Sequence, residues 1–390
     1  MMDLNKVIND VVKEIPPSGI RKFFDLASEM EGVISLGVGE PDFDTPWQIR
    51  EAAIYSIEQG KTFYTANRGL SELRKEICRY QKRKFNLKYE YDKNCIVTVG
   101  GSEAIDLAFR AIINPGDEVI LLQPSYVAYS PGVILAGGKT VNIILKEENQ
   151  FKLTPELLEN AITPKTKAIL LNYPSNPTGG FMTKEDYEKI VPIIKKHELI
   201  VITDEIYAEL SYEQKFCSIA SFDEIKDQVI LVSGFSKAYA MTGWRLGYVL
   251  ANEVIIKAMN KIHQYVIMSA PTAAQYGAIE AMRYCDDEIE KMRKAYMLRR
   301  NYIVKAFNDM GLHTFTPQGA FYVFPCIRST KMTSQQFCEE LLKDQLVACV
   351  PGTAFGQAGE GFIRVSYAYS IEQIKEATTR IKKFLDKLDI

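Results

Sequence analysis

Lys237 stands just after an apolar segment, VILVSG, where a solvated surface lysine is not expected. A partly desolvated amine has a lowered pKa and is suited to forming an imine with an aldehyde. Arg245, eight residues later, supplies a planar guanidinium that can bind a phosphate. This spacing predicts a lysine that reacts with a carbonyl group next to an anion-binding site.

A carboxylate closes a second apolar segment, LIVITD, at Asp204, and Tyr207 follows three positions later. A carboxylate at the end of a buried strand is costly unless it meets a cation. A protonated pyridine nitrogen is such a cation, and keeping it protonated makes the ring an electron sink. The alternative is that Asp204 caps the helix that follows.

Two loops rich in glycine, proline and serine follow further apolar segments. Gly100, Gly101 and Ser102 come after NCIVTV and open the stretch EAIDLAFRAI. Glycines let a backbone approach a phosphate closely, and a helix N-terminus favours an anion. Alternatively, Ser102 is simply a helix N-cap. After KAILLNY, the loop from Pro174 to Gly179 contains Asn176 and is either a tight turn or part of a site.

Arg364 lies in the middle of the predicted strand GFIRVSYA. Ile363, Val365 and Tyr367 share one face of this period-2 pattern, and Arg364 lies on the other. A guanidinium in mid-strand needs an anion. That anion is either an internal carboxylate or the carboxylate of a substrate held by two hydrogen bonds.

The elements that position these residues alternate along the chain from about residue 95 to 250. Buried strands are predicted for NCIVTV, DEVILL, KAILLNY, LIVITD, VILVSG and RLGYVL, and helices for SEAIDLAFRAI and KEDYEKIVPIIKKH. This alternation predicts an α/β fold with a mostly parallel sheet, whose ligands bind beyond the carboxyl ends of the strands.

The C-terminal part has a different pattern, which predicts a second, α+β domain. It starts with a long charged helix over 286–310 and continues with strands FYVFP and FIRVSYA and a closing helix over 371–388. At the other end of the chain, Pro16–Gly19 is predicted to be a loop that feeds an N-terminal arm.

The composition excludes several classes of protein. The 390 residues carry a net charge of −2 without a long run of like charge, so neither nucleic acid nor a membrane surface is expected as the main partner. Seven cysteines without a C-x-x-C pair and three scattered histidines give no metal-ligand spacing, and the thiols are expected to be reduced. Neither a signal peptide nor a transmembrane segment is expected, so the predicted location is cytoplasmic.

Four motifs in order, GEPDFDTP, SNPTG, TDEIY and SGFSKAYAMTGWRLG, resemble the class I aminotransferases of the fold-type I pyridoxal-phosphate superfamily. The resemblance runs from about residue 18 to the C-terminus. It implies a large cofactor-binding domain over 46–280, with a seven-stranded sheet between helices, and a smaller domain built from 1–45 and 281–390. It also implies a homodimer with shared active sites.

The resemblance implies a role for each motif residue. Lys237 holds pyridoxal phosphate as a Schiff base and moves the proton between the substrate Cα and the cofactor, and Asp204 pairs with the pyridine N–H. The other implied cofactor contacts are Tyr207 and Asn176 at the phenolic oxygen, Tyr126 on the ring, Gly101, Ser102, Ser236 and Arg245 at the phosphate, and Tyr64 at the partner subunit's phosphate. Arg364 is implied to bind the substrate α-carboxylate, aided by Asn176 and the backbone of Gly39.

The chain departs from the family pattern at Gly234, where many relatives have serine, and this leaves the phosphate contact of Ser236 open. An arginine for a distal carboxylate is not identified. SGIRKF and KIHQY resemble enzymes that act on aspartate-like or N-acyl-diaminopimelate substrates. Arg21 is either that arginine or a structural one.

The predicted function is therefore transfer of an amino group between an amino acid and a 2-oxo acid by a ping-pong cycle. One alternative is a carbon–sulfur β-lyase, which would use the same lysine but release ammonia and pyruvate from a cysteine conjugate. Another is a binding module that keeps the cofactor without turnover. A dinucleotide-dependent dehydrogenase is disfavoured because no G-x-G-x-x-G follows a predicted strand.

Overall fold

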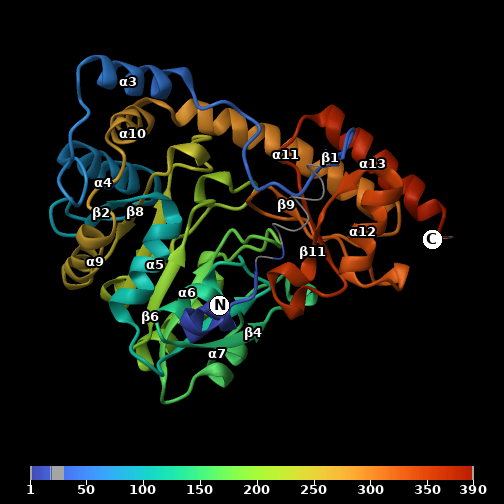
Figure 1. Cartoon of the computed structure of the whole chain (residues 1–390), viewed down its shortest axis with the longest axis horizontal. Coiled ribbons are helices and arrows are strands. Elements are labelled where there is room, and N and C mark those ends of the chain that lie inside the picture. Colours follow the sequence, from blue (N-terminus) through green and yellow to red (C-terminus); the bar gives the residue numbers. More distant parts are fainter. Residues whose placement is uncertain (1, 18, 20–29, 389–390) are drawn as a thin grey trace.

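A seven-stranded sheet forms the centre of the computed structural model, which describes residues 2–17, 19 and 30–388 (Figure 1). In spatial order its strands are β2 (Cys95–Thr98), β8 (Gly247–Leu250), β7 (Val229–Gly234), β6 (Ile200–Asp204), β5 (Thr166–Asn172), β3 (Glu118–Gln123) and β4 (Lys139–Ile144). In this sheet only β8 runs antiparallel to its neighbours. The predicted mostly parallel sheet is confirmed.

Both faces of the sheet are buried, which explains why the strands are nearly continuous apolar segments. Leu170 of β5 packs in one core, whereas Ile169 and Leu171 pack in the core on the opposite face. The first face is covered by α5 (Gly100–Ile112), α6 (Tyr129–Leu135) and α9 (Glu253–Val266). The second is covered by α4 (Ser71–Phe85), α8 (Lys184–Lys196) and α10 (Thr272–Tyr284). Outside these layers, α3 (Trp47–Glu58) packs against α10, and α7 (Pro155–Ala161) packs against α8.

Six of the strands coincide with the predicted apolar segments, but β4 was not predicted. Its sequence, KTVNII, mixes polar and apolar residues because it is an edge strand, and most of its side chains are partly or fully exposed. A search for continuous apolar runs therefore passes over it.

The C-terminal part combines helices with small sheets, as the sequence predicted (Figure 1), and it supplies most of a separate hydrophobic cluster. Its helices are α11 (Asp286–Asp309), α12 (Ser334–Gln345) and α13 (Ile371–Asp386). A three-stranded sheet has the order β11 (Val350–Pro351), β12 (Ile363–Ser366) and β9 (Tyr322–Val323). Near the N-terminus, β1 (Ile34–Ser35) pairs in parallel with β10 (Val347–Ala348), so residues from both ends of the chain meet there.

The first described residues form the short helices η1 (Leu4–Val7) and α1 (Asp10–Glu14), and α1 lies beside α6. The predicted loop at Pro16–Gly19 includes residue 18, which lies outside the described residues. Within the described ranges, no helix is long and apolar enough to cross a membrane, and no group of three potential metal ligands is found.

Candidate active site

A pocket of about 620 Å³ lies where β5, β6 and β7 end and where α5 begins. It is also bordered by residues of β9 and β12 from the C-terminal part. All the predicted site residues except Tyr64 line it: Gly39, Gly101, Ser102, Tyr126, Asn176, Asp204, Tyr207, Ser236, Lys237, Arg245 and Arg364. The pocket thus lies beyond the carboxyl ends of these parallel strands, where open sheets of this kind bind ligands.

Lys237 follows β7 and extends its amine into the pocket, where Nζ donates a hydrogen bond to the carbonyl oxygen of Gly39. Burial lowers the pKa of Lys237 to about 8, and the nearby carboxylate of Glu40 opposes that shift. About a tenth of this amine is therefore neutral at pH 7, and the neutral form is the one that attacks a carbonyl carbon.

Asp204 is the last residue of β6 and is 6% exposed. Its Oδ2 accepts a hydrogen bond of 2.8 Å from the hydroxyl of Tyr129, and its Oδ1 accepts one of 3.1 Å from the backbone N–H of Ile206. Burial raises the pKa of the Asp204 carboxyl. The bond to Ile206 is a local turn contact. It caps no α-helix, because a 3-10 turn with Tyr207 at its N-cap follows.

The start of α5 and Arg245 lie against each other. Gly100 has a φ of +72°, and a Cβ there would lie 2.8 Å from a terminal guanidinium nitrogen of Arg245. The N-cap of α5 is Val99, so the alternative role of Ser102 as N-cap is wrong, and its hydroxyl lies in the first turn facing the pocket. Arg245 Nη1 donates to the carbonyl of Thr242 at 3.0 Å. A helix N-terminus, hydroxyls and a guanidinium together form an anion site.

Arg364 of β12 is 3% exposed and lies between two aromatic rings, with its Cζ 4.5 Å from the ring centre of Tyr322 and 4.8 Å from that of Phe355. Its Nη1 donates to the side-chain oxygen of Asn176 at 3.0 Å, and Nη2 donates to the carbonyl of Gly37. Among the described residues, Nε has no hydrogen-bond partner and no carboxylate pairs with the guanidinium. A buried cation without an internal anion favours an anion that enters the pocket.

The pocket is also lined by residues that were not predicted, among them Glu40, Tyr129, Asn172 and Tyr322. The side chain of Asn172 accepts the backbone N–H of Asn176 at 3.1 Å and donates to the carbonyl of Asp204 at 3.0 Å, and so ties two strand ends together. Its position at the end of KAILLNY was a usable signal, because it is a polar residue where a parallel strand ends. Tyr129 and Tyr322 are aromatic residues in apolar surroundings, which on sequence alone read as core.

A partly buried carboxylate and a buried imidazole support the first turn of α5. Glu103 Oε2 accepts the backbone N–H of Val99, and Oε1 lies 2.6 Å from Nδ1 of His263 on α9. His263 is fully buried. The pair therefore fixes the turn that carries Gly101 and Ser102 to the helix behind it.

Tyr64 is 82% exposed and does not line the pocket of its own chain. Arg21 lies outside the described residues, so the structure does not place it. Gly234 is the last residue of β7. Ser236 lines the pocket and is 8% exposed.

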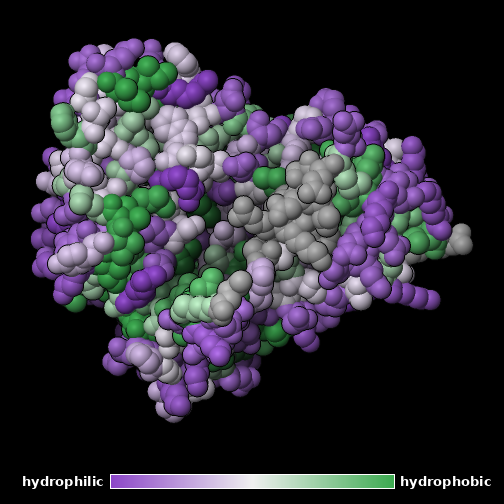
Figure 2. All heavy atoms as spheres, viewed as in Figure 1, coloured by the Kyte–Doolittle hydropathy of each residue, from purple (hydrophilic) through white to green (hydrophobic). Residues whose placement is uncertain are grey.

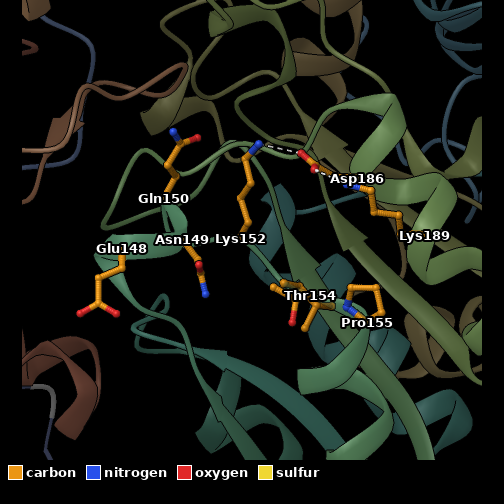
Figure 3. A pocket seen from close by; sticks show the side chains of 9 residues that line it. Glu148, Asn149, Gln150, Lys152, Thr154, Pro155, Asp186 and Lys189 are labelled. Atoms are coloured by element: carbon orange, nitrogen blue, oxygen red, sulfur yellow. Dashed lines mark hydrogen bonds and ion pairs between the residues drawn. The ribbon is translucent and has the colours of Figure 1, made fainter.

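A second, smaller pocket of about 240 Å³ is formed by residues 148–150 and 152–155 with Asp186 and Lys189 (Figure 3). Lys152 Nζ forms an ion pair of 2.7 Å with Asp186 Oδ2, and the same carboxylate caps α8. These charges already satisfy each other, and no sequence-predicted site residue lies here. The pocket at the strand ends is the better candidate.

The donor set of the larger pocket fits pyridoxal phosphate group by group. A lysine with a lowered pKa suits the aldehyde, a buried carboxylate suits a protonated ring nitrogen, and the α5 turn with Arg245 suits a phosphate. Arg364 with its unpaired Nε remains for a substrate carboxylate.

Comparisons with known proteins agree with this geometry. A model described as aminotransferase class I and II matches residues 31–381. The chain is 54% identical over 384 residues to a putative aminotransferase, YugH, of Bacillus subtilis, covering 98% of this chain and 100% of the relative. It is 42% identical to a probable N-acetyl-LL-diaminopimelate aminotransferase of the same organism, covering 98% and 97%. The solved structure of an aspartate aminotransferase from Thermus thermophilus with maleate superposes with a TM-score of 0.93 at 36% identity, covering 98% and 100%.

Proposed function

This chain belongs to the class I and II aminotransferase family, and from that premise we propose how its pocket residues transfer an amino group. The chain is an aminotransferase, and its family uses pyridoxal phosphate. When bound, that cofactor supplies an electron-withdrawing ring that stabilises negative charge at the substrate α-carbon. The observation that carries the proposal is the convergence of Lys237, Asp204, Arg245 and Arg364 on one pocket.

Lys237 is proposed as the covalent anchor and the proton carrier. Its pKa of about 8 leaves enough neutral amine to react with an aldehyde and, once released, to take a proton from the substrate α-carbon. The carbonyl of Gly39 holds Nζ at one side of the pocket. Lys237 would then give this proton to the cofactor side of the carbon–nitrogen bond and not back to the α-carbon, so that the amino group would stay with the cofactor.

Asp204 is proposed to hold the ring nitrogen protonated. Its two oxygens are fixed by Tyr129 and by the N–H of Ile206, so the carboxylate cannot turn away. A buried carboxylate stays ionised when a cation faces it, and that mutual stabilisation is the role assigned to Asp204.

The phosphate is assigned to Gly101, Ser102, Ser236 and Arg245, which line one side of the pocket. Tyr126 is assigned to the ring face; it packs edge-on against Tyr129, with ring centres 5.5 Å apart. Tyr207 and Asn176 are assigned to the phenolic oxygen. Both residues line the pocket, and the side-chain oxygen of Asn176 accepts a hydrogen bond from Arg364.

Arg364 is proposed to bind the α-carboxylate, with Asn176 and the backbone of Gly39 beside it. Bidentate binding orients the amino acid so that its α-carbon faces Lys237. For the substrate side chain, we propose an acid related to aspartate or to an N-acylated diaminopimelate. The names of the relatives support this class, and they do not decide between its members.

We further propose a homodimer in which Tyr64 reaches the partner's phosphate site. Large apolar side chains are exposed on and around α3, including Trp47 at 56% and Tyr55 at 60%, and Figure 2 shows hydrophobic side chains gathered over α3. Further exposed ones lie beside Tyr64 and at the end of α9: Phe63, Tyr265, Val266, Ile267 and Met268. Apolar groups in this number mark a surface that another protein covers.

Two other features stay proposals. The large domain is assigned to 46–280 and the small domain to 1–45 and 281–390, which the pairing of β1 with β10 supports. A cytoplasmic location is supported by seven cysteines, none of which forms a disulfide.

The test is a screen of the purified protein against a panel of amino acids, following the absorption of the bound cofactor, with analysis of the products. Transamination yields the 2-oxo acid of the donor and regenerates with a second oxo acid. Ammonia and pyruvate from a cysteine conjugate as the main products would instead indicate a β-lyase. The absence of any spectral response across the panel would indicate a binding module.

A further inference from the structure

Tyr322 of β9 contacts two of the assigned residues of the active-site pocket, Arg364 and Tyr207. Its ring lies against the guanidinium of Arg364, with 4.5 Å between Cζ and the ring centre. Its hydroxyl oxygen lies 2.8 Å from that of Tyr207. Both tyrosines are buried, and both line the pocket. The hydroxyl of Tyr322 is therefore at the proposed phenolic-oxygen contact while its ring is at the proposed carboxylate contact.

The surroundings of Tyr322 leave its hydroxyl little freedom. The rings of Tyr322 and Tyr207 meet edge to face, with centres 5.9 Å apart, and Phe321 packs on both. On another side, a Cβ at Gly39 would overlap the hydroxyl oxygen of Tyr322, so the backbone of Gly39 packs directly against this hydroxyl. A hydroxyl packed this closely can maintain one hydrogen-bond geometry through the reaction.

The hydrogen bond between the two hydroxyls has a direction once an acceptor occupies the pocket. Tyr207 has a single proton, and if it donates that proton to an acceptor, its oxygen can only accept from Tyr322. Among the described residues, Tyr207 is the hydrogen-bond partner of the Tyr322 hydroxyl. Tyr322 then donates to Tyr207, and each bond in such a chain strengthens the next.

We propose that Tyr322 is a positioning residue whose hydroxyl donates to Tyr207 and directs the Tyr207 proton into the pocket, onto the phenolic oxygen of the cofactor. This rests on the proposed role of Tyr207. A stronger donor at the phenolic oxygen favours its deprotonated form and lowers the pKa of the bound chromophore. Tyr322 thereby lowers the pKa of the bound cofactor without contacting the cofactor itself.

Other titratable side chains face the same pocket and contribute to the same titration. They are Glu40, Tyr126, Tyr129, Asp204, Lys237, Arg245 and Arg364. A test must therefore change the Tyr322 hydroxyl alone, and Tyr322→Phe does so because it keeps the ring against Arg364.

The experiment titrates the absorption of the bound cofactor with pH in the holoenzyme, for the parent, Tyr322→Phe, Tyr207→Phe and the double variant. For Tyr322→Phe we expect the acid dissociation constant of the chromophore to fall about threefold, the size of one neutral hydrogen bond. Tyr207→Phe should lower it further, and the double variant should match Tyr207→Phe because the contribution of Tyr322 passes through Tyr207.

Tyr367→Phe is the matched control. Tyr367 is fully buried in the same core, its hydroxyl donates to the carbonyl of Ala320 at 3.1 Å, and it does not line the pocket. It should leave the titration unchanged. An equal shift for Tyr367→Phe and Tyr322→Phe would mean a general effect on the core and would overturn the proposal.

The experiment distinguishes a wrong assignment of Tyr207 from a wrong role of Tyr322. If Tyr207→Phe left the titration unchanged, the assignment of Tyr207 to the phenolic oxygen would be wrong. If Tyr207→Phe shifted it and Tyr322→Phe did not, only the relay through Tyr322 would be wrong. Binding of maleate or 3-phenylpropionate, whichever binds the parent more tightly, should change less than about twofold in Tyr322→Phe, because the ring against Arg364 remains. A large loss there would point to a displaced Arg364 and would also overturn the relay.

Discussion

Nη1 of Arg364 lies 3.0 Å from the side-chain oxygen of Asn176, although 188 positions separate the two residues in the chain. The contact joins a strand of the C-terminal part to the loop that follows β5 of the central sheet. Two groups assigned to one ligand are thus held in register by a direct bond between them. A substrate carboxylate that binds Arg364 therefore also lies beside Asn176.

The first prediction concerns the guanidinium of Arg364. Arg364→Lys keeps the charge and loses the planar fork, so carboxylate affinity should fall about 10- to 100-fold while cofactor affinity is unchanged. The measurement is the dissociation constant of a carboxylate inhibitor together with that of pyridoxal phosphate. Arg300→Lys is a matched control, because Arg300 is equally buried but pairs with Glu213 outside the pocket. Equal losses in the two variants would make Arg364 a structural residue.

The second prediction concerns the amine of Lys237, whose pKa burial lowers to about 8. The neutral amine is the reactive form, and it is depleted as the pH falls below the pKa. Covalent capture of pyridoxal phosphate by the cofactor-free protein should therefore slow about tenfold per pH unit below 8 and level off above it. Stopped-flow absorbance measures this rate. A rate that kept rising up to pH 10 would mean that the pKa of Lys237 is not lowered.

Lys237→Ala should abolish the transamination half-reaction, whereas Lys152→Ala, which alters the second pocket, should not affect it.

The sequence predicted part of the site by one criterion, the polar residue at the end of an apolar strand. Arg364 was predicted from its place in mid-strand, and Gly39, Tyr64 and Tyr126 from the family resemblance. The strand-end criterion found Asp204 and Lys237, and it could have found Asn172, because strand ends lie at one edge of the sheet. It could not find Tyr322 or Tyr129. Their hydroxyls meet Tyr207 and Asp204 only through tertiary contacts, 115 and 75 positions apart. The exposed edge strand β4 was missed for the opposite reason, since it lacks a continuous apolar run.

The third prediction concerns Asp204. Asp204→Ala removes the counter-charge for the ring nitrogen, so the single-turnover rate with an amino acid should fall by orders of magnitude, beyond the loss in cofactor affinity. Glu205→Gln is the control, because that neighbouring carboxyl is buried against Ser218 and Thr203 and does not line the pocket. An unchanged single-turnover rate in saturated Asp204→Ala would show that this carboxylate has only a structural role.

The fourth prediction concerns the support behind the phosphate site. Glu103→Gln weakens the bonds to Val99 and His263 that fix the first turn of α5. The affinity for pyridoxal phosphate should fall about three- to tenfold, while the turnover number at saturating cofactor stays close to that of the parent. Equilibrium dialysis with the cofactor measures the first quantity and steady-state kinetics the second. If turnover fell and affinity did not, Glu103 would act on the chemistry and not on the phosphate turn.

The last prediction concerns Tyr64, which is 82% exposed and absent from the pocket of its own chain. If Tyr64 serves the partner's phosphate site, a mixed dimer of Tyr64→Phe and Lys237→Ala chains has both substitutions in one active site and neither in the other. The site that contains the intact lysine receives its tyrosine from the Lys237→Ala chain and is complete, and the other site carries both lesions. One complete site and one doubly defective site result because, in an isologous interface, each subunit gives the partner the same residue that it receives.

Measured at limiting cofactor, where a weakened phosphate site limits activity, the purified mixed dimer should show about half of the parent activity, as one of its two sites is intact. The Lys237→Ala homodimer should be inactive, and the Tyr64→Phe homodimer should be weakened. If Tyr64 instead acted within its own chain, the intact lysine would share its site with phenylalanine. The mixed dimer would then reach only half of the activity of the Tyr64→Phe homodimer. Sedimentation at the assay concentration completes the test, because a fully active monomer would exclude a shared site.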